Sequence, residues 1–157
     1  MKIVLLVIGK TDEAYLATGV SKYINRIEHY AQFEMMVIPD IKNRKTLSEA
    51  QQKKLEGELI LNQITSGDAM VLLDENGKVF SSRGFSQWLE RQMNTGCKRL
   101  VFVIGGPYGF SQDVYAKANA KISLSEMTFS HQMVRLVFTE QLYRAFTILK
   151  GEQYHHD

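Results

Sequence analysis

Short apolar runs rich in Val, Ile and Leu alternate along the chain with longer segments whose apolar residues recur at helical spacing. The runs are almost continuously apolar, which is typical of strands buried on both faces of a parallel sheet. The pattern predicts an α/β fold, a parallel sheet with helices on both sides. The expected strands cover 3–9, 33–39, 69–74, 99–106 and 121–125. The expected helices cover 12–30, 46–65, 84–95 and 130–149.

Capping residues and glycines mark the boundaries of these elements. Side chains that accept hydrogen bonds from a first helical turn lie at or beside three expected helix starts, at Thr11, Ser48 and Ser82. Glycines that break regular structure are Gly67, Gly77 and Gly96.

The last expected helix carries a broad apolar stripe with charged residues at its borders. Arg135 falls near one edge of the stripe and Arg144 just beyond the other. The stripe is wide enough to face the sheet and a partner subunit at once. A surface ion pair is the simplest role for Glu140 and Arg144, which are spaced i,i+4. The stripe consists of Val134, Val137, Phe138, Leu142, Ala145, Phe146 and Leu149.

Composition places the chain among ordinary globular proteins. With 157 residues, of which 45% are apolar and 23% charged, we expect one domain over residues 1–157. The net charge of +2 permits a nucleic-acid partner without requiring one. Cys97 is the one cysteine, so no internal disulfide can form, and no signal segment or membrane-spanning apolar run is visible. We therefore expect a cytoplasmic protein with no membrane contact.

Familiar nucleotide and metal motifs fail when they are tested residue by residue. The GKT at 9–11 lacks the earlier glycine of a phosphate loop, because Val4 stands at that position. In GGPYGF, Pro107 and Phe110 occupy the second and third glycine positions of the dinucleotide fingerprint. No H-E-x-x-H, C-x-x-C or G-x-S-x-G occurs, so no metal site and no esterase-type nucleophile is expected.

The stretch VIGGPYGFS at 103–111 ends an apolar run in glycines and leads into Ser111, a possible helix cap. A strand that ends in this way commonly holds a ligand against main-chain atoms, because glycines permit close approach. The residues alone do not say which ligand.

Five sequence blocks, in order, carry a specific resemblance. The chain resembles the SPOUT-class family of 23S ribosomal RNA large-subunit pseudouridine N3-methyltransferases over essentially its whole length. The blocks are LDENGK (73–78), FVIGGPYGFS (102–111), SLSEMTFSHQMVR (123–135), EQLYRAFTI (140–148) and YHH (154–156).

The resemblance implies a trefoil knot near the C-terminus, a homodimer and S-adenosylmethionine as cofactor. Periodicity by itself gives no sign of a knot, and the general expectation is against one. The absence of a phosphate loop agrees with a cofactor that has no phosphates. The implied cofactor-binding residues are Leu73, Gly105, Gly106, Leu124, Ser125, Glu126, Met127, Thr128 and Phe129.

The resemblance also implies catalytic roles near the C-terminus. Arg144 is the candidate cation that stabilises charge developing on the base, and His155 with Tyr154 is the candidate for substrate contact or proton handling. His131 is expected to hold the cofactor loop, although a histidine bonded only to the preceding loop is an equally simple interpretation. The family pattern has arginine at the last basic position of the tail, where His156 stands here. This difference leaves the charge of the tail at neutral pH open.

Two other functions remain open. One is a non-catalytic ribosome-binding module that retains the fold, and the other is a SPOUT-class transfer RNA methyltransferase. The chain has no separate RNA-binding domain, so we expect the substrate to be large-subunit ribosomal RNA within an assembled subunit or ribosome.

Overall fold

A computed structural model describes all 157 residues. Its centre is a five-stranded sheet in the order β2-β1-β4-β3-β5, in which every neighbouring pair is parallel. The predicted parallel sheet is confirmed, whereas the trefoil knot stays a prediction. The strands are β1 Lys2–Ile8, β2 Gln32–Ile38, β3 Asp68–Val79, β4 Arg99–Ile104 and β5 Ala120–Ser123.

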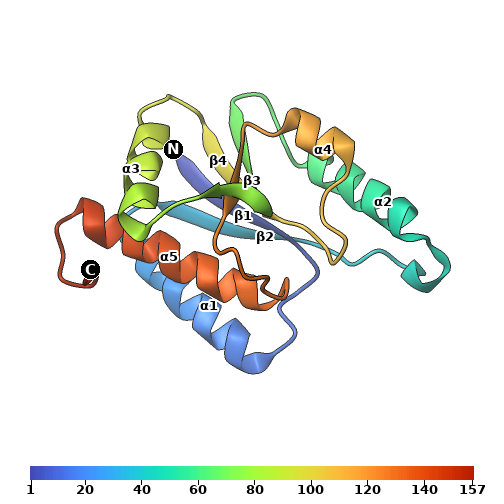
Figure 1. Cartoon of the computed structure of the whole chain (residues 1–157), viewed down its shortest axis with the longest axis horizontal. Coiled ribbons are helices and arrows are strands. Elements are labelled where there is room, and N and C mark those ends of the chain that lie inside the picture. The colour runs from blue at the N-terminus through green and yellow to red at the C-terminus, as the bar shows by residue number, and fades with distance from the viewer.

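Helices cover both faces of the sheet, as predicted (Figure 1). Helices α1, α3 and α5 pack over one face, and α2 with the short α4 packs over the other. None of these helices combines the length and the apolar character needed to cross a membrane. The helices are α1 Ala14–Ile27, α2 Glu49–Asn62, α3 Ser82–Met93, α4 Gln112–Lys117 and α5 Met133–Leu149, with a 3-10 turn η1 at Arg44–Thr46.

Serine caps fix the starts of α2, α3 and α4, and at α4 the expected cap Ser111 accepts from the Val114 N–H. Ser48 forms a reciprocal capping box with Gln51, in which its hydroxyl accepts from the Gln51 N–H and the Gln51 side chain accepts from the Ser48 N–H. The cap of α3 is Ser81, the neighbour of the predicted Ser82. These local bonds satisfy amide groups that a helix start leaves unpaired.

Strand β3 is longer than the predicted run at 69–74. It pairs with β5 up to Leu73, and pairing resumes at Lys78, so residues 74–77 bulge out of the ladder. Gly77 was expected to break regular structure, but it lies inside this strand. A Cβ at Gly77 would come within 2.6 Å of the Ile122 backbone nitrogen, so only glycine permits the two chains to pass this closely. Because of this bulge, the residues directly after Leu73 lie at the carboxyl edge of the sheet.

Arg135 lies in the core and not at the edge of the apolar stripe, which corrects the prediction from helical spacing. Its side chain is among the largest fully buried ones, with 1% of its surface exposed. The guanidinium donates to the carbonyls of Ile8 at 2.8 Å and Gly9 at 2.9 Å, and to the hydroxyl of Thr11 at 3.1 Å. Thr11 therefore accepts from Arg135, and α1 starts after Glu13 without a side-chain cap. These bonds tie the first turn of α5 to the carboxyl end of β1.

Candidate functional site

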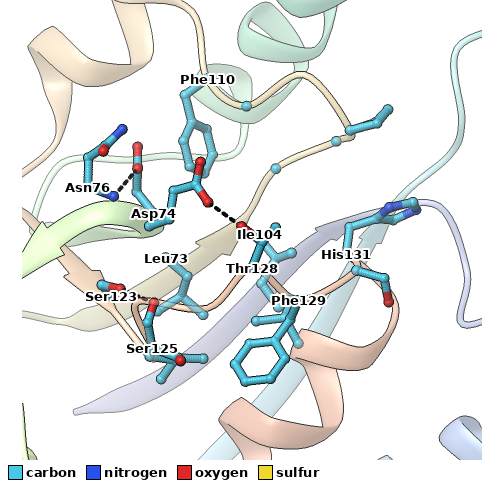
Figure 2. A pocket seen from close by; sticks show the side chains of 18 of the residues that line it. Leu73, Asp74, Asn76, Ile104, Phe110, Ser123, Ser125, Thr128, Phe129 and His131 are labelled. Atoms are coloured by element: carbon cyan, nitrogen blue, oxygen red, sulfur yellow. Dashed lines mark hydrogen bonds between the residues drawn. The ribbon is translucent and has the colours of Figure 1, made fainter. Parts of the chain in front are cut away.

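A pocket of about 590 Å³ opens at the carboxyl ends of β3, β4 and β5. This volume is within the range of small-molecule sites. Its walls come from three segments that are far apart in the sequence: the bulge of β3, the glycine-rich loop 105–110 and the loop 123–131 before α5. Figure 2 shows Asp74 and Asn76 at one side of this pocket and His131 at the other. The pocket thus lies where ligands of open α/β sheets commonly bind.

The charges around the pocket restrict the kind of ligand. The 22 lining residues include the carboxylates of Asp74 and Glu75 but no Lys or Arg. Such a lining repels phosphate and attracts a positive group. The pocket therefore favours an uncharged or cationic molecule over a nucleotide phosphate.

Hydrogen bonds among side chains order the rim of the pocket. Asp74 accepts from the backbone N–H of Asn76 at 2.8 Å and from the hydroxyl of Tyr115. Burial, followed by the bond to Asp74, raises the pKa of Tyr115 to about 12, so this hydroxyl keeps its proton. Thr128 donates to Glu75 at 2.9 Å, which joins the β3 bulge to the loop before α5 (Figure 2). The two segments therefore hold each other in place across the pocket.

The glycines of loop 105–110 make room for protein atoms. A Cβ at Gly105 would come within 3.0 Å of the Phe110 ring. A Cβ at Gly106 would come within 2.4 Å of the Glu56 carboxylate. The sequence suggested that these glycines clear space for the ligand, but the spaces they leave are filled by Phe110 and by Glu56 behind the pocket wall. Because neither glycine has a Cβ, the backbone at 105 and 106 can approach these two side chains closely.

Glu56 is a buried acid with few partners. Only 3% of its surface is exposed, its Oε2 lies 3.3 Å from the Gln52 side-chain amide, and its Oε1 has no hydrogen-bond partner. Burial raises the pKa of this carboxyl, and the charge of Asp40 raises it further, whereas the Gln52 bond and the charge of Arg44 lower it. Gly106 of the pocket wall therefore packs against Glu56, a carboxyl group whose ionisation burial makes unfavourable.

The structure brings eight of the nine predicted cofactor-binding residues together around this pocket. Glu126 is exposed and does not line it. His131 does line it, next to the loop it was expected to hold. The eight are Leu73, Gly105, Gly106, Leu124, Ser125, Met127, Thr128 and Phe129.

Sequence reasoning missed the polar side of the pocket. Asp74, Glu75 and Tyr115 were not singled out, yet they line it. A signal for two of them was present, because Asp74 and Glu75 directly follow a buried strand and so had to lie at its carboxyl edge. Tyr115 gave no comparable signal, since it lies on the short helix α4, for which Ser111 was expected as a possible cap but no residue range was predicted.

The predicted catalytic residues Arg144, Tyr154 and His155 form a second cluster, with Glu140. The Arg144 Nε donates to Glu140 Oε1 at 3.1 Å, and the Tyr154 hydroxyl donates to the same oxygen at 3.0 Å. The Arg144 guanidinium carbon lies 4.7 Å from the centre of the Tyr154 ring, within cation-π range. The expected i,i+4 pair of Glu140 and Arg144 is present, but as part of a half-buried network and not as an isolated surface pair.

Hydrogen bonding sets the protonation of this cluster. Arg144 Nη1 lies 3.1 Å from His155 Nδ1, and because arginine can only donate, Nδ1 is the acceptor. His155 Nε2 therefore carries the proton and donates to Asp157 at 2.8 Å. The bond to Arg83, followed by the bond to His155, lowers the pKa of Asp157. Burial raises the pKa of Tyr154, so Tyr154 keeps its proton and presents a ring and a hydroxyl donor.

The pocket and the tail cluster lie at opposite ends of α5. The last α5 residue that lines the pocket is Val134, and Arg144 follows ten residues later, about 15 Å along the helix axis. None of the three predicted catalytic residues lines the pocket. In Figure 1 the loop before α5 lies at one end of this helix and the C-terminus lies beyond the other end. Within one chain, the two groups of predicted site residues are separate.

A parallel sheet with a glycine-walled pocket at its carboxyl edge, lined by two carboxylates and by no Lys or Arg, defines an α/β protein whose pocket favours an uncharged or cationic small molecule. No group of three or more His, Cys, Asp or Glu side chains is arranged to hold a metal ion. Residues 1–155 match the family model described as predicted SPOUT methyltransferase, and the chain belongs to this family of methyltransferases.

Curated relatives are similar over the whole chain. Proteins named ribosomal RNA large subunit methyltransferase H are 64% identical in Parabacteroides distasonis, over 100% of both chains, and 62% identical in Christiangramia forsetii, over 99% of both chains. The protein of that name in Flavobacterium johnsoniae is 61% identical, also over 99% of both chains.

Proposed function

We propose that the protein transfers a methyl group from S-adenosylmethionine to N3 of a pseudouridine in 23S ribosomal RNA of the large ribosomal subunit. The observation that carries the cofactor assignment is the pocket of about 590 Å³ with two carboxylates and no Lys or Arg. The substrate assignment is supported by the names of relatives that are 61–64% identical over at least 99% of their length.

The pocket residues fit the chemistry of this cofactor. Leu73, Ile104 and Phe129 offer apolar walls for an adenine, and the main chain of the two loops offers donors and acceptors for its polar edge. Asp74 and Glu75 favour the positive charges of the sulfonium and the amino group. When bound, the cofactor supplies an activated methyl group, so the protein chiefly has to align the acceptor with it.

The tail cluster offers the groups that the target base requires. Removal of the N3 proton leaves negative charge on the base, and the Arg144 guanidinium is the cation that would stabilise it. Glu140 and Tyr154 hold that guanidinium in place. Both ring nitrogens of His155 are occupied, Nδ1 by Arg144 and Nε2 by Asp157, so His155 can donate its Nε2 proton to the substrate only when the Asp157 bond opens.

A homodimer is required if both groups act in one reaction. Because about 15 Å of helix separates Val134 from Arg144, the tail of one subunit does not serve the pocket of the same subunit. We propose that each active site joins the pocket of one subunit to Arg144, Tyr154 and His155 of the other. The apolar stripe of α5 was expected to be wide enough to face a second subunit as well as the sheet.

Labelled S-adenosylmethionine tests the proposed function on three substrates: assembled large subunits, protein-free ribosomal RNA and bulk transfer RNA. We expect methyl transfer to be fastest on large subunits, and mass spectrometry should locate the label on N3 of a pseudouridine. Large subunits that contain uridine at that site are the matched control and should react more slowly.

Each alternative gives a different result in the same assay. Transfer to transfer RNA alone would support the SPOUT-class transfer RNA methyltransferase. Binding to large subunits without any affinity for S-adenosylmethionine would support a non-catalytic module. Equal rates on assembled subunits and protein-free RNA would overturn the requirement for an assembled substrate.

A further inference from the structure

Positive charge is concentrated in one segment, residues 42–54, which we call the basic segment. It contains five of the 19 Lys and Arg residues of the chain and one of the 17 acidic residues. The segment therefore has a net charge of +4. Because the whole chain has a net charge of +2, all other residues together have a net charge of −2. Without this segment the protein would be slightly acidic, which is unfavourable for binding a polyanion.

The first part of the basic segment is a formed turn. Asn43 adopts a left-handed backbone with φ of 59°, the one residue other than glycine with positive φ. The Thr46 hydroxyl and backbone N–H both donate to the Asn43 carbonyl, at 2.8 and 3.0 Å. This turn leads into η1 and leaves Lys42, Arg44 and Lys45 exposed to solvent. The three cations are therefore held together on one short piece of ordered chain.

The basic segment lies at the same edge of the sheet as the pocket. It follows the carboxyl end of β2, and all five strands are parallel, so their carboxyl ends share one edge (Figure 1). Arg44 Nη1 lies 3.3 Å from Asp40, and the Asp40 carboxylate lies against Gly9, which follows β1, the strand that pairs with β4. A substrate that reaches the pocket therefore passes near these cations.

We propose that Lys42, Arg44 and Lys45 bind the phosphate backbone of the substrate RNA next to the methylated base. The proposal rests on the proposed function and adds the surface that holds the RNA. Phosphate contacts of this kind position an RNA without reading its sequence. They also separate two tasks, because the pocket lined by Asp74 and Glu75 repels phosphates while the basic segment attracts them.

Arg44 already has one partner, and this partner does not prevent phosphate binding. Its Nη1 lies 3.3 Å from Asp40, and both side chains are more than half exposed. A pair of this kind is worth about 1 kcal/mol or less. Arg44 can therefore turn to a phosphate, and its planar guanidinium matches a phosphate group in two parallel hydrogen bonds.

Two triple variants with the same loss of charge test the proposal. The first is Lys42→Gln with Arg44→Gln and Lys45→Gln, and the second, as a control, changes Lys2, Arg91 and Lys98 to Gln. Lys2 is the first residue of β1, Lys98 directly precedes β4 and Arg91 lies in the last turn of α3, and none of the three lines the pocket. Steady-state methylation of large subunits at several salt concentrations, together with calorimetry of S-adenosylmethionine binding, gives KM, kcat and cofactor affinity for each variant.

We expect the first triple variant to raise KM for large subunits on the order of tenfold, with a smaller change in kcat and unchanged cofactor affinity. The slope of log affinity against log salt should become shallower by about 2 to 3, which corresponds to the loss of that many phosphate contacts. The control should change KM less than about twofold, because its charges lie outside the RNA contact.

Two results would overturn the proposal. Equal increases in KM for both triple variants would mean that only net charge matters, and an unchanged KM for the first would mean that the segment is a solvated surface. If the unaltered protein itself transfers no methyl group to large subunits, the proposed function fails. Direct binding of the three proteins to large subunits then still decides whether the basic segment contacts RNA.

Discussion

The two ends of helix α5 differ in what they offer a ligand. At the amino end lies a cavity walled by glycines, apolar side chains and two carboxylates, and Arg135 is buried in the first turn of the helix. At the carboxyl end Arg144, Glu140, Tyr154 and His155 bond to one another without any of them lining that cavity. The first end has space for a molecule, and the second has polar groups that already satisfy each other.

Helix α5 thus has the pocket at one end and the tail cluster at the other. An α-helix keeps its ends at a fixed distance, so the pocket and the tail cluster cannot approach each other within a chain without breaking it. Under the proposed function, a second subunit or the substrate has to bring the tail groups and a pocket together. The two arginines of the helix illustrate the contrast. Arg135 bonds the helix to the end of β1, whereas Arg144 is half-buried beside the tail.

Removal of the tail is expected to have the largest effect. Truncation after Glu152 deletes Tyr154 and His155 and leaves the sheet, the pocket and α5 intact. Methyl transfer should fall on the order of a thousandfold, while calorimetry should show S-adenosylmethionine affinity within about twofold of the full chain. A parallel loss of cofactor binding would contradict the separation of the two ends.

Mixing variants then tests whether the active site is shared. The truncated chain and a full-length Gly106→Val chain each lack one half of the proposed site, so each homodimer should be inactive. Heterodimers contain one site with an intact pocket and an intact tail, and activity should return in them. If native mass spectrometry detects heterodimers and no activity returns, the shared site is wrong.

The same substitution at the two arginines should separate stability from activity. Arg144→Met should lower kcat on the order of a hundredfold with little change in Tm, because it removes the cation that stabilises the base. Arg135→Met should instead lower the free energy of unfolding by about 2 to 4 kcal/mol, because it leaves the buried carbonyls of Ile8 and Gly9 without donors. Urea unfolding and single-turnover kinetics measure both quantities, and a large loss of stability in Arg144→Met would reverse the assignment.

A double-mutant cycle at the pocket wall distinguishes ligand space from protein packing. Gly106→Ala places a Cβ against the Glu56 carboxylate, and we expect S-adenosylmethionine affinity to fall about tenfold as the loop shifts. In a Glu56→Ala background the same change should cost less than about threefold, because the obstruction is gone. An equal loss in both backgrounds would mean that the new methyl group meets the cofactor directly.

The smallest expected effect concerns the ionisation of Glu56. Its pKa is raised in the folded protein, so the folded state binds more protons than the unfolded one and stability falls as pH rises through the raised pKa. Glu56→Gln removes this loss and should raise Tm by a few degrees at pH 8, with the difference shrinking as pH falls toward about 4.3, the ordinary pKa of glutamate. Glu58→Gln changes an exposed residue of the same helix and serves as the control. A pH-independent difference would exclude the linkage.

Part of the candidate site was implied by the family resemblance, and the topology of the sheet explains why these residues meet. Gly105, Gly106 and the loop 124–129 follow strands β4 and β5, and the carboxyl ends of parallel strands meet at one edge. Eight of nine expected cofactor residues accordingly line one pocket. Tyr115 was not predicted because its bond to Asp74 joins residues that are 41 positions apart in the sequence, and no local pattern indicates such a contact.

Hydrophobic patterning predicted the five strands, four of the five helices and the two covered faces of the sheet, because short, almost continuously apolar runs rich in Val and Ile are typical of strands buried on both faces. The serine cap of α2 was likewise legible, since a capping box spans only four residues. Tertiary structure alone decided that Arg135 is buried, because carbonyls at the end of a strand 127 residues away provide its partners. It also decided what the glycines of the pocket accommodate, because the Glu56 carboxylate comes from a different helix. Spacing along a helix reports direction around its axis, whereas burial depends on what the rest of the chain places there.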